Sequence, residues 1–461
     1  MPRFKAQPTK LEPERAILVG VDTGTGEWSL DESLAELGRL VETDGGEVVA
    51  TLAQRLEVPV ARTYLGSGKA EELRDLARSL DADVVVFDDE LSPSQQSNLE
   101  KIVGSHVKVI DRTALILDIF AAHATTKEGR LQVQLAQANY LLPRLRGMWS
   151  HLVGEQTRGG IGSRFGQGES QLEVDRRLVR KRISFLTQEL KELSSQRHTQ
   201  SKARWESGVW RVALVGYTNA GKSTILNKLT GSSVYAKDEL FATLDPTTRA
   251  IELEEGRKIT ITDTVGFIQK LPTLLVESFK STLSEAINAD LILKVVDISD
   301  PHAEKELSVV DSILKEIGAD KIRSVVVYNK SDLVPEEALR QLEAMHPDAV
   351  FISALDGKGL RGLLFRIAQE AAKGDITMTV EVPYEKGILM SLLHERCQIL
   401  HEEYHEGGLR ATAKVPERLA GHFRALPSGG LRKPRGAGTH HKSCVPVEAA
   451  QMRRIAGWWK I

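Results

Sequence analysis

The sequence predicts an α/β protein of several domains. Apolar segments of strand length alternate with helical patterns in two stretches, at residues 16–110 and 212–352, which is typical of parallel sheets covered by helices. Two helical patterns with a heptad repeat lie between these stretches. A chain of 461 residues is also too long to form one hydrophobic core.

The first predicted unit, residues 1–125, is a small α/β domain. Its expected strands are Ala16–Val21, Val84–Phe87 and Val107–Ile110, and its expected helices are Leu30–Val41, Ala70–Leu80 and Pro93–Val103. Gly66–Lys69 (GSGK) resembles a fragment of a phosphate loop, but the four-residue spacer between its glycines is missing. A turn that leads into a helix is the favoured interpretation of this segment.

Residues 126–206 are predicted to form a helical hairpin. The first apolar stripe is Leu131, Leu135, Ala138, Leu142 and Leu145, and the second is Val179, Ile183, Leu186, Leu190 and Leu193. Both stripes have heptad spacing, so the two helices should bury these residues against each other. Pro143 is expected to disturb the first helix near its end, because proline lacks the backbone donor.

A glycine-rich segment, Arg158–Glu169, separates the two stripes and carries Arg158, Arg164 and Phe165. A flexible connector is the simplest interpretation. However, a hairpin needs only a few residues to turn, and residues 126–182 hold 11 Lys and Arg against 5 Asp and Glu. We therefore expect this tip to contact nucleic acid, with Arg158, Arg164 and Phe165 as candidate RNA-binding residues.

A complete phosphate-loop motif, GxxxxGK[ST], follows the apolar strand Val212–Val215 and leads into a helix that extends to Leu229. Its backbone N–H groups would surround phosphate oxygens, Lys222 would reach the β- and γ-phosphates, and Ser223 would bind Mg²⁺. The nucleotide-binding residues expected here are Gly216, Tyr217, Thr218, Asn219, Ala220, Gly221, Lys222, Ser223 and Thr224. Asn219 could also help to hold a K⁺ ion at the transition state, or could brace the loop by hydrogen bonds.

Further motifs follow at the ends of predicted strands and specify guanine. Asp332 can accept hydrogen bonds from N1–H and the 2-amino group of guanine, neither of which adenine offers. The strands are Lys258–Thr262, Leu291–Val296, Val325–Tyr328 and Val350–Ile352. The residues expected to bind nucleotide after them are Asp263, Thr264, Val265 and Gly266, then Asn329, Lys330, Ser331 and Asp332, then Ser353, Ala354 and Leu355. In this order, the motifs indicate a P-loop GTPase domain at residues 207–373.

A candidate switch, Leu240–Arg249, lies between the phosphate loop and Asp263. Its residues Phe241, Ala242, Thr243, Leu244 and Asp245 are expected to bind nucleotide. A switch threonine joins Mg²⁺ when the γ-phosphate is present. Thr243 is the choice, with Thr247 and Thr248 as rivals, so the expected Mg²⁺ ligands are Ser223, Thr243 and Asp263. The expected catalytic residues are Lys222, Thr243 and Gly266.

The residue after the Asp263–Gly266 motif is Phe267, where many GTPases carry a glutamine that orients water. An apolar ring can neither orient nor polarise water. Hydrolysis is therefore expected to be slow unless a partner, an ion or another residue assists it.

The C-terminal part is predicted to be a small α+β domain, residues 374–426, followed by a basic irregular tail, residues 427–461. The expected elements are a strand at Thr377–Val382, a helix at Leu389–Leu400 and a strand at Leu409–Val415. The complete predicted fold is thus a P-loop GTPase domain preceded by a small α/β domain with a long helical hairpin, and followed by a small α+β appendage.

Composition places the chain among ordinary globular proteins, with 41% apolar residues, 27% charged residues and a net charge of −2. Its two cysteines form no metal-binding spacing, and no apolar run approaches the roughly 20 residues that cross a bilayer. We expect a cytoplasmic protein without a membrane span, and a monomer.

The chain resembles the HflX family of ribosome-associated GTPases. The resemblance covers roughly residues 14–425 and is carried by FATLDPTTR, DTVGF and four earlier segments: Tyr64–Leu73, Asp89–Gln96, Asp111–Phe120 and Glu128–Ala136. It implies GTP and GDP as ligands, the large ribosomal subunit and its RNA as partners, and separation of stalled or idle ribosomes into subunits. In that picture the glycine-rich tip reaches ribosomal RNA near the peptidyl-transferase centre.

Three other functions stay open at this point. The protein could be an assembly GTPase of the large subunit, an RNA-binding scaffold locked by nucleotide, or an RNA-remodelling ATPase. The motif Asn329–Asp332 argues against ATP at this site, because it is built to accept from guanine. Sequence alone does not separate rescue from assembly.

Overall fold

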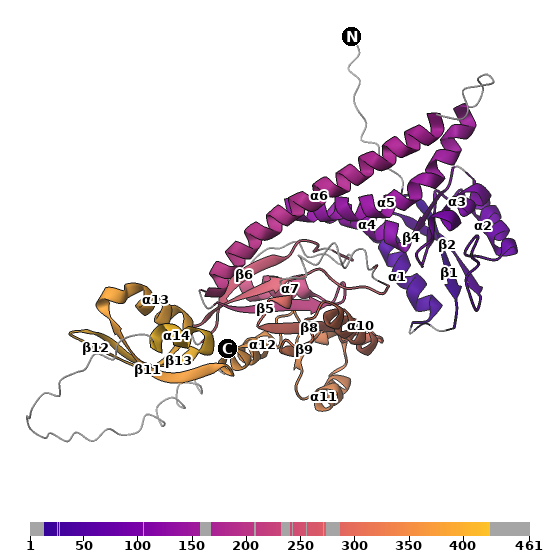
Figure 1. Cartoon of the computed structure of the whole chain (residues 1–461). Coiled ribbons are helices and arrows are strands. Elements are labelled where there is room, and N and C mark those ends of the chain that lie inside the picture. Colours follow the sequence, from indigo (N-terminus) through magenta and orange to yellow (C-terminus); the bar gives the residue numbers. More distant parts are fainter. Residues whose placement is uncertain are drawn as a thin grey trace, which may run out of the picture.

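The computed structural model describes residues 13–424 except 25, 27, 105, 157–166, 207–208, 232–239, 242, 255, 271 and 273–285. Figure 1 shows an N-terminal domain and a C-terminal domain at opposite ends of the molecule, with the sheet of the nucleotide domain between them. Two long helices leave the N-terminal domain, and the second runs back toward the nucleotide domain.

The N-terminal domain is a parallel sheet with strand order β2-β1-β3-β4. Its strands are β1 (Arg15–Asp22), β2 (Glu47–Arg55), β3 (Val84–Phe87) and β4 (Lys108–Asp111). Its helices are α1 (Leu30–Thr43), α2 (Ser67–Ser79), α3 (Pro93–Val103) and α4 (Arg112–His123). The three predicted strands and three predicted helices are confirmed. The sequence missed β2, an edge strand whose nine residues include a single buried one and so form no continuous apolar run.

The GSGK segment lies at the start of α2. Gly66 is the N-cap of this helix, and Lys69 forms an ion pair with Glu72 one turn later. Strand β2 ends at Arg55 and does not lead directly into the segment. This placement fits a turn that leads into a helix.

The hairpin consists of α5 (Lys127–Gln156) and α6 (Gln167–Glu206). Residues of both predicted stripes are buried or half-buried, and Leu186 is fully buried. Pro143 does not end α5, which continues through it to Gln156. The loss of one donor is offset by packing, since α5 lies against α3, α4 and α6.

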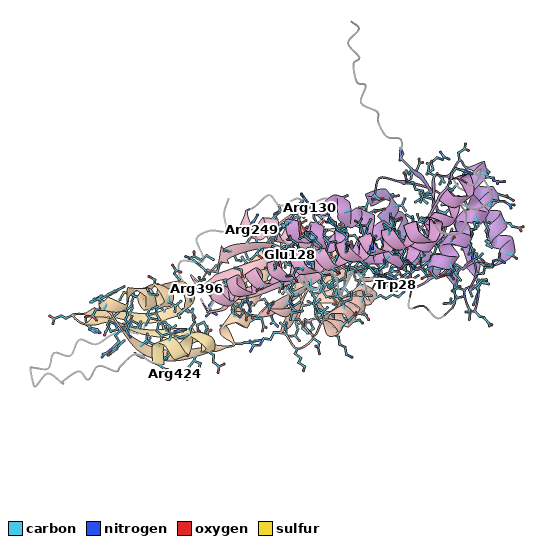
Figure 2. All side chains as sticks on the ribbon, turned by 45° about the horizontal axis from the view of Figure 1, so that its top comes forward. Trp28, Glu128, Arg130, Arg249, Arg396 and Arg424 are labelled. Carbon is cyan, nitrogen blue, oxygen red and sulfur yellow. The ribbon has the colours of Figure 1, made fainter. Side chains whose placement is uncertain are left out.

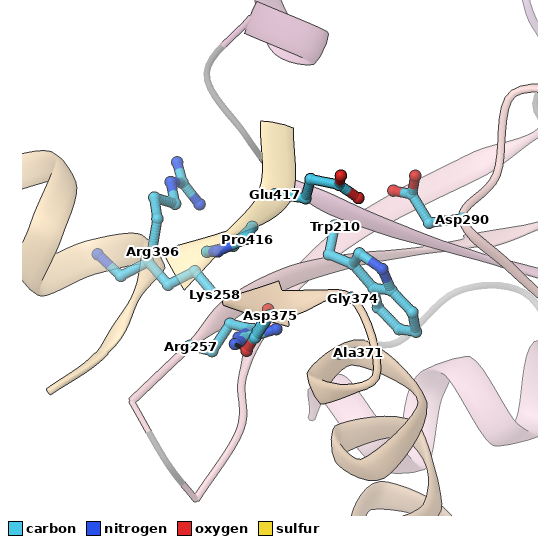
Figure 3. Close-up of a pocket in the computed structure, with 10 residues that line it drawn as sticks. All are labelled: Trp210, Arg257, Lys258, Asp290, Ala371, Gly374, Asp375, Arg396, Pro416 and Glu417. Carbon is cyan, nitrogen blue, oxygen red and sulfur yellow. Dashed lines mark hydrogen bonds and ion pairs between the residues drawn. The ribbon is translucent and has the colours of Figure 1, made fainter. Parts of the chain in front are cut away.

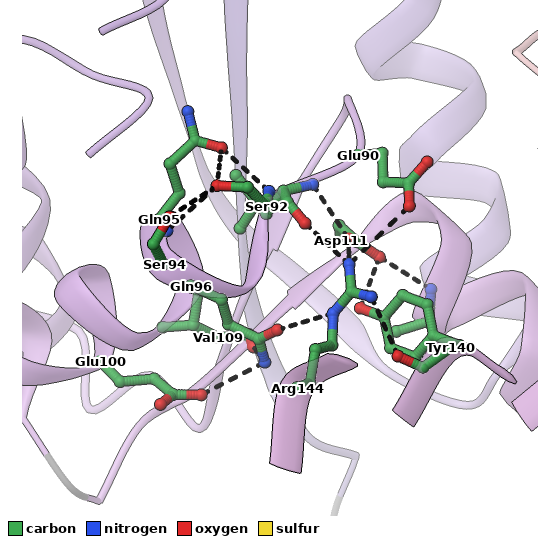
Figure 4. Close-up of polar contacts among 12 residues, drawn as sticks. Glu90, Ser92, Ser94, Gln95, Gln96, Glu100, Val109, Asp111, Tyr140 and Arg144 are labelled. Carbon is green, nitrogen blue, oxygen red and sulfur yellow. Dashed lines mark hydrogen bonds and ion pairs between the residues drawn. The ribbon is translucent and has the colours of Figure 1, made fainter. Parts of the chain in front are cut away.

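Arg144 of α5 holds the hairpin on the N-terminal sheet (Figure 4). Its guanidinium donates to the backbone oxygen of Leu91 at 2.7 Å, to Asp111 at 3.2 Å and to the Gln96 side chain at 3.1 Å. It also lies over the Tyr140 ring, 3.5 Å from the centroid. Helix α5 is thereby fixed to the N-terminal domain along its length and not only at its start.

The nucleotide domain has a six-stranded sheet in the order β10-β9-β8-β5-β7-β6, parallel except for β6. Its strands are β5 (Trp210–Gly216), β6 (Thr247–Glu252), β7 (Lys258–Asp263), β8 (Leu291–Asp297), β9 (Ser324–Asn329) and β10 (Val350–Phe351). Its described helices include α7 (Lys222–Thr230), α10 (Ala303–Glu316), α11 (Glu336–Met345) and α12 (Leu360–Ala372). The predicted strands are confirmed, and the edge strand β6 was missed.

The C-terminal domain is an antiparallel sheet with order β11-β13-β12 and two helices. Its elements are β11 (Asp375–Pro383), α13 (Gly387–Arg396), β12 (Gln398–His405), β13 (Gly408–Pro416) and α14 (Glu417–Arg424). The α+β prediction is confirmed, but the helix expected to reach Leu400 ends at Arg396 and β12 follows. The tail predicted at residues 427–461 lies outside the described residues. Within the described part of the chain, no helix combines the length and apolar character needed to cross a membrane.

A buried ionic network joins the N-terminal domain to the nucleotide domain. Arg112 is 1% exposed and donates to Glu36 at 2.6 Å and to Asp88 at 3.2 Å. Lys270, from the nucleotide domain, donates to Asp88 and to Asp89. The Tyr217 hydroxyl, in the phosphate loop, donates to Glu36. Each buried carboxylate in this network is thus shared between the two domains.

We expect Arg112→Met to destabilise the protein by about 3–5 kcal/mol, because it leaves Glu36 and Asp88 buried with too few partners. Urea unfolding followed by circular dichroism measures the loss. Arg340→Met is the control, since Arg340 is 73% exposed in its side chain and its pair with Glu336 should contribute less than about 1 kcal/mol. If Arg112→Met lowers the free energy of unfolding no more than Arg340→Met does, the network does not stabilise the protein.

Candidate nucleotide-binding site

The phosphate loop connects β5 to α7 and depends on glycine at two positions. Gly216 lies so close to β8 that a Cβ atom would stand 2.1 Å from the Val295 backbone oxygen. Gly221 has φ 91°, and a Cβ there would stand 2.2 Å from the Asn329 side chain. These contacts leave room only for hydrogen at both positions, so the loop can curl tightly over the N-terminus of α7.

Lys222 is buried beneath this loop and has no carboxylate within ion-pair distance among the residues that the structure describes. Its amine donates to the backbone oxygens of Gly216, at 3.1 Å, and Tyr217, at 2.7 Å. Burial lowers its pKa to about 8. A buried cation held by neutral carbonyl groups favours an incoming anion, and the phosphates of a nucleotide supply that charge.

The three residues expected to bind Mg²⁺ come together at one point. The Ser223 hydroxyl donates to Asp263 Oδ2 at 2.6 Å, and Ser223 Oγ lies 2.7 Å from Thr243 Oγ1. Within the described part of the chain, the other oxygen of Asp263 is buried without a hydrogen-bond partner, and burial raises the pKa of this carboxyl. Hard oxygen donors and an unsatisfied buried carboxylate fit a small divalent cation such as Mg²⁺.

The rival threonines lie elsewhere. Thr247 and Thr248 are in β6, where they pair with Asp263 and Thr262 of β7. The Thr248 hydroxyl lies 2.9 Å from that of Thr262, so it is within hydrogen-bond distance of the neighbouring strand.

The loop after β7 is joined to the phosphate loop by its backbone. Thr218 N–H donates to the Phe267 oxygen at 2.8 Å, and Phe267 N–H donates to the Gly216 oxygen at 3.1 Å. Gly266 approaches the Lys222 amine, since a Cβ there would lie 3.0 Å from Nζ. The Phe267 ring is 1% exposed and packs in the core with Val215 and Val310, so it does not take the place of a water-orienting side chain.

The loops expected to bind guanine meet through Asn329. Its amide donates to the Ala220 backbone oxygen at 2.9 Å, and its carbonyl oxygen accepts from Ala354 N–H at 2.9 Å. Lys330, with φ 61°, forms an ion pair with Asp297 at 2.6 Å. Asp332 and Leu355 are exposed beside this junction. Asn329 therefore joins the phosphate loop to the loops that follow β9 and β10.

The other expected residues lie around this frame. Thr218 Oγ1 is buried and has no hydrogen-bond partner among the described residues, while Thr264 Oγ1 donates to the Leu214 oxygen at 2.7 Å. Val265 packs in the core cluster that the N-terminal and nucleotide domains share, and Thr224 lies in the first turn of α7. Ser331 N–H donates to the Ile352 oxygen, and the Ser353 hydroxyl accepts from Asp356 N–H. Ala242, Arg158, Arg164 and Phe165 lie outside the described residues.

Sequence reasoning missed several residues that position this site. The first part of the candidate switch, Leu240–Asp245 (switch I), contacts Thr125 and Thr126 at the base of the hairpin through Asp245. Tyr217 turns its hydroxyl away from the phosphate loop toward Glu36. These partners are more than 100 residues away along the chain, and nothing in the local sequence marks them.

A cavity of about 420 Å³ lies between the nucleotide and C-terminal domains (Figure 3). Its lining mixes basic and acidic side chains, among them Arg257, Lys258, Arg396, Asp375 and Glu417. Arg257 and Asp375 form a buried ion pair at its edge. None of the residues that line it belongs to the phosphate loop or to the loops expected to bind guanine. This cavity is therefore part of the interface between the two domains and is separate from the candidate nucleotide site.

Comparison with known proteins agrees with this geometry. The chain matches three family models, described as GTP-binding GTPase N-terminal (residues 31–121), GTP-binding GTPase Middle Region (residues 123–204) and 50S ribosome-binding GTPase (residues 211–330). GTPase HflX of Caldanaerobacter subterraneus subsp. tengcongensis is 44% identical over 412 residues, which is 88% of this chain and 93% of the relative. The chain belongs to the HflX family of GTPases.

Other members of the HflX family are similarly close. GTPase HflX of Escherichia coli K12 is 41% identical over 390 residues, covering 84% of this chain and 90% of the relative. Among solved structures, the SsGBP complex with GDP is 25% identical, covers 78% of this chain and 99% of that chain, and has a TM-score of 0.43. Membership of the HflX family makes the chain a GTP-hydrolysing enzyme, and its residues 211–330 match the model described as 50S ribosome-binding GTPase.

We expect Asp332→Asn to weaken GDP binding by roughly 10- to 100-fold, because an amide cannot accept from two guanine donors at once. Titration with fluorescent GDP and competition with ATP measure affinity and base preference. Asp348→Asn, at another exposed position of the same domain, is the control for loss of a negative charge. An unchanged preference for GTP over ATP would show that Asp332 does not read the base.

Proposed function

We propose that this HflX-family GTPase acts in the cytoplasm, binds the large ribosomal subunit and separates stalled or idle ribosomes into subunits. Lys222, Ser223, Thr243, Asp263 and Gly266 surround the phosphates and Mg²⁺ in this proposal. The bound Mg²⁺ would neutralise charge on the β- and γ-phosphates. Lys222 would hold the same phosphates, and the Gly266 N–H would donate to the γ-phosphate.

The hairpin is the single observation that carries the ribosomal part of the proposal. Helix α6 has 40 residues, which corresponds to a length of about 60 Å. Figure 1 shows the end where α5 and α6 meet lying away from the nucleotide sheet, beyond the N-terminal domain. An arm of this length carries the end of α5 and the start of α6 far from the phosphate loop.

The arm also carries a run of basic residues in the first half of α6. Arg177, Arg180 and Lys181 are exposed on α6, and exposed Arg182 contacts the Gln134 side chain of α5 at 2.7 Å. A basic surface favours a polyanion such as ribosomal RNA. We propose that Arg158, Arg164 and Phe165 extend this contact from the tip.

Hydrolysis in this proposal is slow in the isolated protein and accelerated by ribosomes. The Phe267 ring is buried in the core, so the described site lacks the usual glutamine at that position. A ribosome could supply the missing group or order the switch. The GTP state would then last until the large subunit is engaged.

Replacing residues 158–169 with a short Gly-Ser turn should abolish subunit separation and leave GDP affinity and basal hydrolysis nearly unchanged. The tip lies outside the nucleotide domain, so only ribosome contact is removed. Sedimentation of intact ribosomes with a non-hydrolysable GTP analogue measures separation, with Arg340→Gln as a control for loss of a basic side chain outside the hairpin.

Three results would contradict the proposal in different ways. Normal separation without the tip would make the hairpin a spacer. Binding only to immature particles would favour an assembly factor, and equal binding with GDP and the GTP analogue would favour a scaffold.

Arg177→Gln with Arg180→Gln should also reduce the salt slope of ribosome binding, by about 0.7–0.9 for each phosphate that the arm no longer neutralises.

We also propose that Asn219 supports a K⁺ ion that stabilises the transition state. Asn219 has φ 62°, a left-handed conformation that asparagine tolerates, so its backbone role and its side chain can be separated. Asn219→Gly should keep the loop and GDP binding but remove any acceleration of hydrolysis by K⁺ relative to Na⁺. Equal rates of the wild-type protein in the two salts would contradict the proposal.

A further inference from the structure

Switch I is anchored on the N-terminal domain rather than lying free beside the nucleotide. Leu240, Phe241 and Leu244 are 6%, 2% and 2% exposed and share one core cluster with side chains of α4 and α5. The Phe241 ring meets the Phe120 ring of α4 nearly at right angles, with 4.7 Å between centroids. Three apolar contacts therefore fix both sides of Thr243.

Asp245, the last residue of switch I, binds the start of the hairpin. Its Oδ2 accepts from the Thr125 N–H at 2.9 Å, the Thr125 hydroxyl at 2.8 Å and the Thr126 N–H at 2.8 Å. Its Oδ1 accepts from the Thr126 hydroxyl at 2.5 Å. The Thr126 hydroxyl oxygen in turn accepts from Gly129 N–H at 2.9 Å, as a helix N-cap does. Asp245 thus completes the cap of α5 from 119 residues away.

Gly129 shows how closely the carboxylate approaches the helix. A Cβ atom at this position would lie 2.3 Å from Asp245 Oδ1, well inside contact distance. An anion there is also favoured by the partial positive charge of a helix N-terminus. Figure 2 labels Glu128 and Arg130, which flank Gly129 in this first turn, and Arg249 of β6, the strand that follows switch I.

We propose that the first turn of α5 positions switch I for GTP hydrolysis, through the hydrogen bonds that Thr125 and Thr126 donate to Asp245. Thr243 is two residues before Asp245, and two residues span at most about 7 Å. Holding the Asp245 carboxylate therefore restricts the Thr243 hydroxyl to the neighbourhood of Ser223 and Asp263, where it lies 2.7 Å from Ser223 Oγ. Asp245 is a positioning residue, since its own contacts are with the hairpin.

The coupling works in both directions, because linkage between two equilibria is reciprocal. When Thr243 is held by Mg²⁺ and the γ-phosphate, the Asp245 cap is stabilised and the base of α5 is held in place. When Thr243 is released after hydrolysis, the cap loses that support. How firmly the base of the hairpin is held thereby depends on whether GTP or GDP is bound.

Gly129→Ala tests this directly, because it displaces the Asp245 carboxylate while alanine favours the helix. Gly68→Ala is the matched control: Gly68 also lies in the first turn of a helix, α2, but a Cβ there has nothing within 4 Å. Both full-length variants are loaded with GDP or with a non-hydrolysable GTP analogue. Affinity for each nucleotide, the Mg²⁺ concentration for half-maximal hydrolysis and amide hydrogen exchange at residues 125–131 are measured.

In the wild-type protein and Gly68→Ala, residues 125–131 should exchange more slowly with the analogue than with GDP. Gly129→Ala should remove this difference, lower affinity for the analogue by roughly fivefold, the size of a helix cap, and raise the Mg²⁺ requirement by a similar factor. Affinity for GDP should stay the same. Thr126→Ala should reproduce these effects, and Thr126→Ser should restore the wild-type values.

Two outcomes would overturn the proposal. If Gly129→Ala and Thr126→Ala match Gly68→Ala in every measurement, the cap does not act on switch I. If they weaken GDP binding as much as analogue binding, the contact supports the nucleotide domain as a whole and does not position Thr243. Neither result bears on ribosome binding, because every measurement uses the protein alone.

Discussion

Arg112 is almost completely removed from solvent, so its charge must be balanced inside the protein. Glu36 and Asp88 provide that balance, but the two carboxylates also accept from groups of the other domain: Glu36 from Tyr217, and Asp88 from Lys270. No member can be removed without leaving a buried charge short of partners, which is costly. The N-terminal domain is therefore held against the phosphate loop and against the loop that follows Phe267.

Because the two domains are held together, switch I can pack against helices α4 and α5. Leu240, Phe241 and Leu244 pack on α4 and α5, and Asp245 caps α5, only because the N-terminal domain is held beside the phosphate loop. Thr243 then lies between the apolar anchors and the cap, next to Ser223 and Asp263. The chemistry of the site and the base of the hairpin are thus parts of one packed region.

The candidate phosphate site gathers buried polar groups that share few hydrogen bonds among the described residues. Lys222 is buried against backbone carbonyl groups, while Asp263 Oδ1 and Thr218 Oγ1 are buried without hydrogen bonds from any described residue. Such groups cost free energy until a partner arrives. In the proposed function, a nucleotide with Mg²⁺ would bring phosphate oxygens to the lysine and a cation to the carboxylate, so binding would remove both unfavourable contributions together.

The sequence by itself determined the elements and motifs whose signals are local. Runs of apolar residues predicted the central strands, and the phosphate loop, Asp263–Gly266 and Asn329–Asp332 were read from spacing alone, because each works through neighbouring backbone. The strands that it missed, β2, β6 and β12, all lie at sheet edges, where few side chains are buried and the apolar pattern is weak. Only the tertiary structure decided that Tyr217 contacts Glu36, that Asp245 caps α5 and that Thr243 lies nearer Ser223 than Thr247 or Thr248. Those contacts join residues 20 to 181 positions apart, and their geometry depends on how whole domains pack.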